Sequence, residues 1–303
     1  MKAHFIAPQA KGQSRLVRYL QWFAALAVGA VAVAAGGQES EGDARRSSAD
    51  ESVRENEAPA VATAVSRDEI AASEVPSPFA QPSPVAWFRV FEKLGSPRWR
   101  QFYSDSGSLT ISNRPRAALK LGVTLTDAYV AVESRGSQEV RNVLADIRTL
   151  EKTLGISERM QQRNSRLGEL ADAEQWQALR VELEATMTEQ QSVLREQRDG
   201  PLADLLPFGL LLRTIAINCE IVRDLELEDR LCIGDITLIY GMIRRVELLP
   251  EETLKERGVR DLRRCLKGVR DCWAAETAGV EVDRITVTQN LIQEFLTSLM
   301  SNE

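Results

Sequence analysis

The stretch SQEVRNVLADIRTLEKTLG, residues 137–155, carries the clearest structural pattern in this chain of 303 residues. Its apolar side chains recur at i, i+3, i+4, i+7, i+10 and i+14, which places them on one face of an α-helix. Gly155 follows the last of them, and glycine is common just after a helix ends. The pattern predicts an amphipathic helix that buries one face, made of Val140, Val143, Leu144, Ile147, Leu150 and Leu154.

Helix signals continue on both sides of this stretch. Upstream, Asn113 and Pro115 form a helix start, with a capping side chain and then proline in the first turn. This helix runs to Gly136, and Ser137 is placed to cap the next one, so the two helices form an antiparallel hairpin. The upstream helix keeps one apolar face, made of Leu121, Leu125, Ala128 and Val132. Downstream helical segments begin near residues 157, 172, 202, 229, 259 and 286.

Short capping patterns set several of these boundaries. Residues 172–175 (DAEQ) and 286–289 (TVTQ) resemble capping boxes at helix starts, and Gly200-Pro201 is expected to stop the helix before it. We find no convincing strand and no repeat of solenoid length. The sequence therefore predicts an all-α fold, a single helical bundle of about seven to eight mostly antiparallel amphipathic helices over residues 85–303.

Two parts of this domain differ from ordinary amphipathic helices. Residues 96–112 follow a short predicted helix that ends at Gly95, and we expect them to be irregular and pinned to the core by aromatic side chains. Residues 202–225 are apolar all round, which predicts a central covered helix. Three charged residues in it, Asp204, Arg213 and Glu220, argue against a membrane span.

The first 37 residues have the layout of an export segment. Basic residues precede an apolar run of about 14 residues from Trp22 to Ala35, and small residues at 32–34 offer a cleavage site. A spanning helix usually needs about 20 residues, so a cleaved signal peptide is favoured over a retained single membrane anchor. Either alternative places the rest of the chain across the membrane, in the periplasm of a bacterium. Residues 38–84 are rich in Pro, Ser and Glu, and predict a disordered linker.

The chain contains one histidine, His4, which lies inside the predicted export segment. If that segment is removed, catalytic triads that use histidine, HExxH zinc sites and covalent haem motifs are excluded. No phosphate-binding glycine motif is present either. The sequence therefore predicts no cofactor and no metal site, and favours a protein that is not an enzyme.

Four cysteines lie in the predicted domain, at 219, 232, 265 and 272. Cys265 and Cys272 would lie about 10 Å apart along one helix, too far for a disulfide. Cys219 and Cys232 flank a predicted turn at similar distances, so they form the favoured disulfide in an oxidising compartment. Pairing with the helix at 259–277 is one alternative, and four small buried apolar residues is another.

One predicted helix face is strongly basic. Its side chains recur at i, i+3, i+4, i+7 and i+10, and could form a surface for an anionic partner such as lipid headgroups, cell-wall polymer or an acidic protein. The alternative is a solvated face paired with Asp261, Asp271 and Glu256. The face comprises Arg260, Arg263, Arg264, Lys267 and Arg270, with Arg244 and Arg245 as possible additions from the preceding helix.

The net charge of −6 argues against nucleic acid as a partner. We expect an exported bacterial envelope protein with a non-catalytic interaction or scaffold domain, whose partner is another envelope protein or an anionic surface. One alternative is a carboxylate-dependent enzyme acting on glycans, with Asp204, Glu220, Asp224 and Asp235 as candidate acids. The other is a bundle that binds a small ligand between its helices. The sequence does not predict an oligomeric state.

Overall fold

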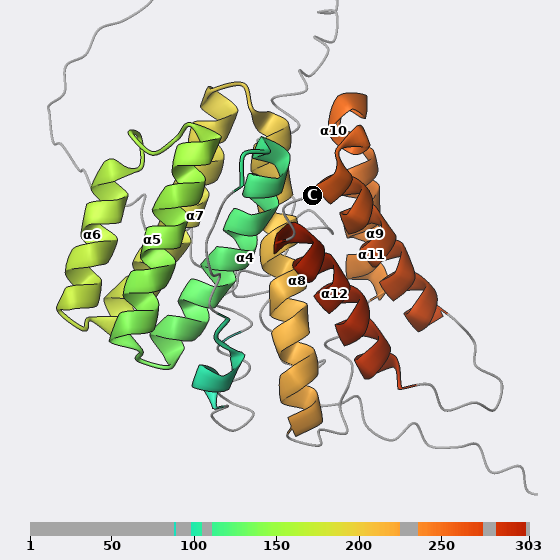
Figure 1. Cartoon of the computed structure of the whole chain (residues 1–303), viewed down its shortest axis with the longest axis horizontal. Helices are drawn as coiled ribbons and strands as arrows, with labels where there is room; N and C mark the ends of the chain where they lie inside the picture. The colour runs from blue at the N-terminus through green and yellow to red at the C-terminus, as the bar shows by residue number, and fades with distance from the viewer. Residues whose placement is uncertain (1–87, 89–97, 105–110, 225–235, 275–282, 301–303) are drawn as a thin grey trace, which may run out of the picture. The chain divides into compact units, whose positions relative to one another are not determined.

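A computed structural model of the chain describes residues 88, 98–104, 111–224, 236–274 and 283–300, all within the compact unit Gln81–Glu303. These residues form nine α-helices and one 3₁₀-helix, with no strand among them (Figure 1). The predicted all-α helical bundle is confirmed for this part of the chain. The elements are η1 (Trp99–Phe102), α4 (Arg114–Glu133), α5 (Ser137–Leu154), α6 (Gln161–Asp172), α7 (Trp176–Glu196), α8 (Gly200–Asp224), α9 (Ile236–Glu247), α10 (Glu251–Lys255), α11 (Arg257–Ala274) and α12 (Arg284–Met300).

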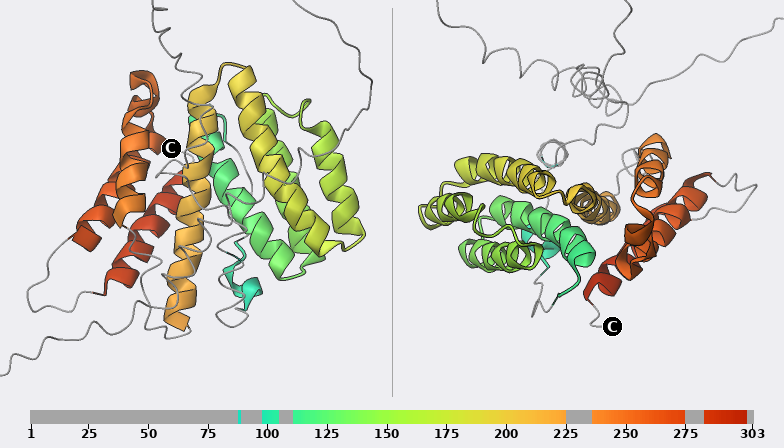
Figure 2. Two further views of the ribbon diagram at one scale, coloured as in Figure 1. Left: turned by 180° about the vertical axis from the view of Figure 1, so that it is seen from behind. Right: turned by 90° about the horizontal axis from the view of Figure 1, so that it is seen from above.

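The predicted export segment, the predicted linker and, apart from Phe88, the helix expected before Gly95 lie outside the described residues. Within these residues, α5, α6 and α7 lie on one side of the central helices α4 and α8 (Figure 1). Helices α9, α11 and α12 form a second group, in which α12 packs against α8 (Figure 2). The core is therefore built around α4 and α8.

The backbones of α4 and α8 are in close contact. A Cβ atom added at Gly209 would lie 1.9 Å from the carbonyl oxygen of Leu119, and one at Gly122 would lie 2.0 Å from that of Leu206. Glycine at both positions lets the helices approach this closely. Every residue of α4 from Ala117 to Val132 is buried, so burial on this helix includes the predicted apolar face and extends all round it. The covering helices α5, α7 and α8, together with η1, leave it no solvent-facing side.

Helix α8 is the apolar central helix that the sequence predicted. It is long and apolar enough to cross a membrane by length and composition, yet 89% of its most apolar window is buried in the bundle. Pro207 lies inside it and cannot donate a hydrogen bond to the carbonyl oxygen of Ala203. The side-chain amide of Gln191 on α7 donates to that oxygen instead, at 3.3 Å. A neighbouring helix thus compensates for the proline.

Two predicted helix boundaries are confirmed. The side chain of Asn113 accepts a hydrogen bond from the backbone N–H of Arg116 at 2.9 Å, as expected of a capping residue. Gly155 has a φ of 76°, the left-handed conformation that follows the end of α5.

The other capping assignments were wrong. Ser137 is the first residue of α5, and its hydroxyl donates to the carboxylate of Glu174. Asp172 ends α6, and α7 begins four residues later at Trp176 without a side-chain cap. At Ser137 the helix begins on the predicted cap itself, whereas at Asp172 the preceding helix occupies the residue that the pattern assigned to the next one.

Two later boundaries also differ from the expectation. Helix α12 begins at Arg284, and Asp283 accepts from the backbone N–H of Thr286 at 3.1 Å, so the TVTQ pattern lies inside the helix. Gly200 opens α8, whereas the sequence assigned Gly200-Pro201 only as the stop of the previous helix. Proline is tolerated near a helix start because the first N–H groups have no acceptor there.

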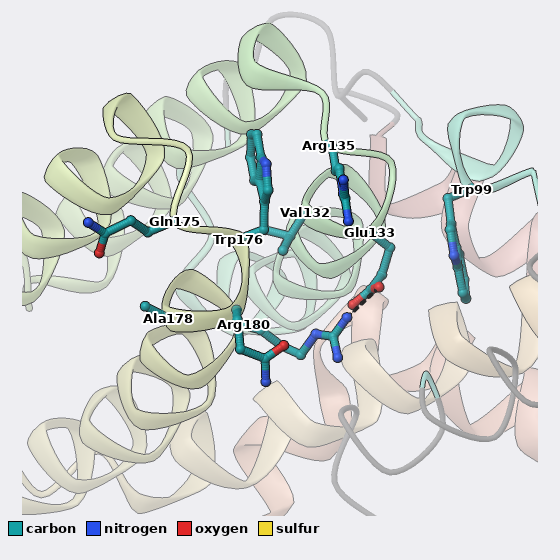
Figure 3. Close-up of a pocket in the computed structure, with 9 residues that line it drawn as sticks. Trp99, Val132, Glu133, Arg135, Gln175, Trp176, Ala178 and Arg180 are labelled. Carbon is teal, nitrogen blue, oxygen red and sulfur yellow. Dashed lines mark hydrogen bonds and ion pairs between the residues drawn. The ribbon is translucent and has the colours of Figure 1, made fainter.

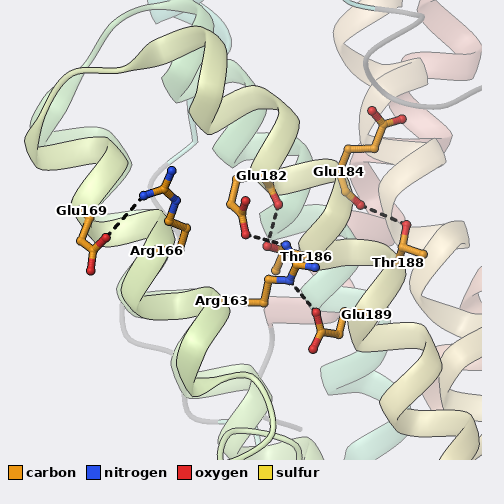
Figure 4. Close-up of polar contacts among 8 residues, drawn as sticks. All are labelled: Arg163, Arg166, Glu169, Glu182, Glu184, Thr186, Thr188 and Glu189. Atoms are coloured by element: carbon orange, nitrogen blue, oxygen red, sulfur yellow. Dashed lines mark hydrogen bonds and ion pairs between the residues drawn. The ribbon is translucent and has the colours of Figure 1, made fainter. Parts of the chain in front are cut away.

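Polar side chains join the outer helices α5, α6 and α7. Glu151 of α5 is fully buried and accepts hydrogen bonds from Asn164 of α6 and Gln190 of α7. Burial raises the pKa of the Glu151 carboxyl, against the opposing effect of these two amide donors. Nearer the surface, Arg163 of α6 bridges Glu182 and Glu189 of α7 (Figure 4). These contacts fix α7, which carries part of the candidate site.

Candidate ligand-binding cleft

A hollow lies between the end of α4, the start of α7 and η1. It has a volume of about 740 Å³, within the range of small-molecule sites. Two tryptophans, Trp99 of η1 and Trp176 of α7, stand on opposite sides of an ion pair in its wall (Figure 3). We call it the Trp99–Trp176 cleft. The described residues that line it are Trp99, Val132, Glu133, Arg135, Gln175, Trp176, Gln177, Ala178 and Arg180.

The ion pair in the cleft wall joins Glu133 to Arg180. An Nη2 nitrogen of Arg180 lies 2.6 Å from Oε2 of Glu133, and the two side chains are only 14% and 5% exposed. Glu133 is the last residue of α4, where the helix dipole disfavours a carboxylate. Arg180 offsets that charge and joins α4 to α7 at the base of the cleft.

A second buried ion pair holds η1 in place. Arg213 of α8 lies 2.8 Å from Asp127 of α4, with side chains 8% and 1% exposed. The same guanidinium donates to the backbone carbonyl of Phe102 at 2.6 Å. Burial raises the pKa of Asp127, and the adjacent Arg213 opposes that shift. Because η1 carries Trp99, this pair positions one wall of the cleft.

Lys120 lies two turns before Asp127 on the same face of α4 and is also buried. Burial lowers the pKa of its amine, and Asp127 and Asp146 raise it. Thr124 lies between Lys120 and Asp127, and its hydroxyl has no hydrogen-bond partner among the described residues. This spacing of i, i+4 and i+7 puts three polar side chains on one face of α4.

An aromatic layer supports the Trp99 wall. The ring of Phe88 lies 5.1 Å from that of Trp99 and stacks on Tyr129 of α4 at 5.7 Å. Trp99 also meets Phe102 edge-on at 6.3 Å. The predicted pinning of residues 96–112 by aromatic side chains is confirmed for η1, in which Trp99 and Phe102 are buried.

Arg135 stands at the rim of the cleft, two residues after α4 ends. Its side chain is exposed and has no ion-pair partner among the described residues. Its backbone has a φ of 52°, in the left-handed region. The charged side chains among the described lining residues are Arg135, Arg180 and Glu133, so these residues leave one positive charge in excess.

The basic face of α11 is present, but most of its cations already have carboxylate partners. Arg264 pairs with Asp261 at 3.1 Å and Arg270 with Asp271 at 2.6 Å, as the paired alternative expected. Glu247 of α9, which the sequence did not suggest, lies 4.0 Å from Arg263 and 3.7 Å from Lys267. Arg260 is exposed.

Two expected neighbours of this face serve other contacts. Glu256 accepts a hydrogen bond from Asn113 at 2.8 Å. The guanidinium of Arg245 lies over the ring of Phe208 at 5.7 Å, which directs it to the core rather than to the basic face. The remaining carboxylates partly balance the face, and its use as an anionic-partner surface stays a prediction.

The three described cysteines have little exposure to solvent. Cys219 and Cys265 are buried, and burial raises the pKa of each thiol to about 12. Cys272 is half-buried, and its thiol donates to the carbonyl of Arg284 at 3.8 Å. Cys232 lies outside the described residues, so the Cys219–Cys232 disulfide stays a prediction.

The candidate catalytic acids do not meet in a described cavity. Asp204 pairs with Arg195 at 3.2 Å on the surface, and Glu220 is half-buried on α8. The side chains of Asp224 and Asp235 lie outside the described residues. Among the described residues there is no group of three or more His, Cys, Asp or Glu side chains that could hold a metal ion.

Comparison with protein-family models, curated proteins and solved structures finds no match for this chain. The cleft itself was not predicted. The sequence predicted an irregular segment at residues 96–112, which includes Trp99, and a helix beginning near residue 172, which includes Trp176, but nothing that brings the two together. The signal that could have suggested the cleft is the pair of charged residues at the end of α4 and just after it, Glu133 and Arg135, together with the aromatic-rich segment upstream.

Proposed function

We propose that this chain is an exported bacterial envelope protein whose helical domain is a non-catalytic binding module. The Trp99–Trp176 cleft is its binding site. The observation that carries the proposal is a hollow of about 740 Å³ that is lined by Trp99 and Trp176, with the Glu133–Arg180 ion pair at its base and Arg135 at its rim. Tryptophan and arginine are the residues that contribute most to binding at protein surfaces.

The composition of the cleft supports binding over catalysis. Its one described carboxylate, Glu133, is held by Arg180, so it is not placed to act as a general acid. Hydrolysis of a glycosidic bond usually requires two carboxyl groups about 5 to 10 Å apart. The described lining has no second carboxylate to serve as the partner of Glu133. A glycan-cleaving enzyme is therefore the weaker alternative.

Export and location are part of the proposal. The basic start, the apolar run and the small residues at 32–34 support transfer across the membrane. Fractionation of cells that express a C-terminally tagged chain, followed by protease treatment of spheroplasts, tests this directly. Loss of the tag only after the outer membrane is opened supports export, and a tag protected inside spheroplasts contradicts it.

Position-specific photo-cross-linking tests the binding site. A benzophenone amino acid replaces exposed Ala178 in the cleft or, as a matched control, exposed Ala145 on α5. Benzophenone captures C–H bonds in proteins and in glycans alike, so it does not presuppose the partner. We expect a reproducible product from position 178 and none from 145. Equal products at both positions, or none at either, contradict the proposed site.

A further inference from the structure

We propose that the Trp99–Trp176 cleft binds a saccharide that carries a carboxylate group. This inference rests on the proposed function of the cleft and adds the chemical class of its ligand. Three features of the lining each require a different property of the ligand, and an acidic sugar chain combines all three.

The first feature is the aromatic lining of the cleft. Trp99 and Trp176 lie on either side of the polar base (Figure 3); Trp176 is half-buried and offers the accessible indole, whereas Trp99 is only 8% exposed. An indole offers a broad apolar surface together with one N–H donor at its edge. A pyranose ring has C–H groups on its faces and hydroxyl groups around its edge, so it suits an indole wall. The volume of about 740 Å³ leaves room for a short oligosaccharide.

The second feature is the excess positive charge. Glu133 is already paired with Arg180 at 2.6 Å, and Arg135 has no ion-pair partner among the described residues. A guanidinium binds a carboxylate through two parallel hydrogen bonds, which gives both affinity and orientation. The cleft therefore favours a ligand with a carboxylate that can reach Arg135.

The third feature is the polar rim. Gln175 and Gln177 line the cleft and are both exposed, so their amide groups are accessible to a ligand. Each amide offers donors and an acceptor, which match the hydroxyl groups of a sugar. An aromatic carboxylic acid could pack against the indole lining and pair with Arg135. It has no hydroxyl groups to hydrogen-bond with the two glutamine amides, which would then bind only water. The rim thus favours a saccharide over an aromatic acid.

Calorimetric titration of the full-length protein in detergent tests this inference with defined probes. They are a trimer of galacturonic acid, a neutral galactose trimer, an acidic peptide and benzoate. We expect the acidic trimer to bind at least tenfold more tightly than each of the other three. An acidic trimer that binds no better than the neutral trimer overturns the role of charge. Tighter binding of the peptide or of benzoate overturns the saccharide assignment.

Two arginine variants provide a matched comparison. Arg135 and Arg198 are both exposed, both follow the end of a helix and both have positive φ, 52° and 64°. Arg198 is not among the residues that line the cleft. We expect Arg135→Gln to weaken binding of the acidic trimer at least tenfold and to leave the neutral trimer unaffected. Arg198→Gln should change neither, and an equal loss in both variants overturns the inference.

Trp176→Phe and Trp176→Ala test the wall, since the phenylalanine variant keeps an aromatic ring if the alanine variant is unstable. Both should weaken the acidic and the neutral trimer by a similar factor, and unchanged affinity in both variants contradicts a stacking wall. The outcome also separates the two proposals. If position 178 gives a cross-link but no saccharide binds, the cleft is still supported as a binding site and only the acidic-saccharide assignment is rejected. Absence of both results removes the binding site as well.

Discussion

The Trp99–Trp176 cleft and the basic face of α11 both present arginines, but their surroundings differ. On α11, Arg264 is 74% exposed and pairs with Asp261 on its own helix. In the cleft, Arg180 is 14% exposed and pairs with Glu133 on another helix, and Arg135 has no described partner. The basic face was visible in the sequence as a charge pattern, whereas the cleft exists only because three separate segments meet. Burial and aromatic neighbours, rather than the number of charges, distinguish the two regions as candidate sites.

The largest expected effect is loss of the buried ion pair that holds η1. Asp127→Ala leaves Arg213 buried without its carboxylate, and we expect the free energy of unfolding to fall by about 3 to 5 kcal/mol. Chemical denaturation measures this change. The matched control is Asp204→Ala, whose pair with Arg195 has side chains 47% and 53% exposed. Its loss should cost under about 1 kcal/mol.

A double variant sharpens this result. Replacing both charged partners with apolar residues, Asp127→Leu with Arg213→Met, removes the unpaired charge and should recover part of the lost stability. If Asp127→Ala lowers the free energy of unfolding no more than Asp204→Ala does, burial does not determine how much an ion pair stabilises this protein. Burial would then no longer distinguish the cleft from the basic face of α11.

The next effect concerns the close approach of α4 and α8. Gly209→Ala places a Cβ atom 1.9 Å from the carbonyl oxygen of Leu119, so the helices must separate. We expect a loss of about 1 to 3 kcal/mol in unfolding free energy, although alanine favours helices more than glycine does. Gly168→Ala on α6 is the control, because its Cβ would contact only the Arg148 guanidinium at 3.6 Å. That variant should be neutral or stabilise the protein by up to about 1 kcal/mol.

Buried Glu151 provides a pH-dependent test. Burial raises its pKa above the ordinary value of 4.5, so the folded state binds the proton more tightly than the unfolded state does. The contribution of this group is therefore most favourable below that value, and the unfolding free energy falls as pH rises towards the folded pKa. Glu151→Gln removes this decrease. The stability of the variant relative to the natural protein should rise with pH by as much as about 1.4 kcal/mol per unit.

Denaturation curves of the two proteins between pH 4 and pH 8 provide the measurement. The glutamine side chain can still accept from Asn164 or Gln190, and the Gln190 carbonyl oxygen has no hydrogen-bond partner among the described residues. We therefore expect the variant to fold. A stability difference that stays constant over this pH range contradicts the raised pKa.

The smallest effect is expected on the basic face of α11. Charge reversal at Arg263 and Arg264 removes surface pairs at 4.0 and 3.1 Å, so we expect less than about 1 kcal/mol of lost stability. If this face is an anionic-partner surface, the same variants weaken binding to vesicles that contain anionic lipid. Unchanged vesicle binding removes that role and leaves the cleft as the sole candidate of the two.

The sequence predicted what short-range patterns determine. The apolar spacing in residues 137–155, the left-handed Gly155 and the Asn113 cap all depend on residues within one or two helical turns. Capping patterns failed at Asp172, which the preceding helix uses, and at Thr286, where Asp283 caps the same helix three residues earlier. The paired cations on α11 were partly predicted because Asp261 and Asp271 lie on the same helix.

The cleft could not be predicted in the same way. Asp127 and Arg213 are 86 positions apart, so no pattern within one helix indicates that they pair. Which carboxylate Arg213 meets depends on the register of α4 against α8, which the two glycines set by close contact. Trp99 and Trp176 face a common space only because that register, and the hydrogen bond to Phe102, hold η1 against α4.

The most direct test of the central claim compares the two surfaces in one experiment. A benzophenone amino acid is placed at Ala178 in the cleft or at Arg260 on the basic face, and cells are irradiated before mass analysis of the captured material. The cleft account predicts a product from position 178 that is lost on Arg135→Gln and retained on Arg198→Gln, with none from 260. A product from position 260 alone would contradict it and assign partner binding to the basic face of α11.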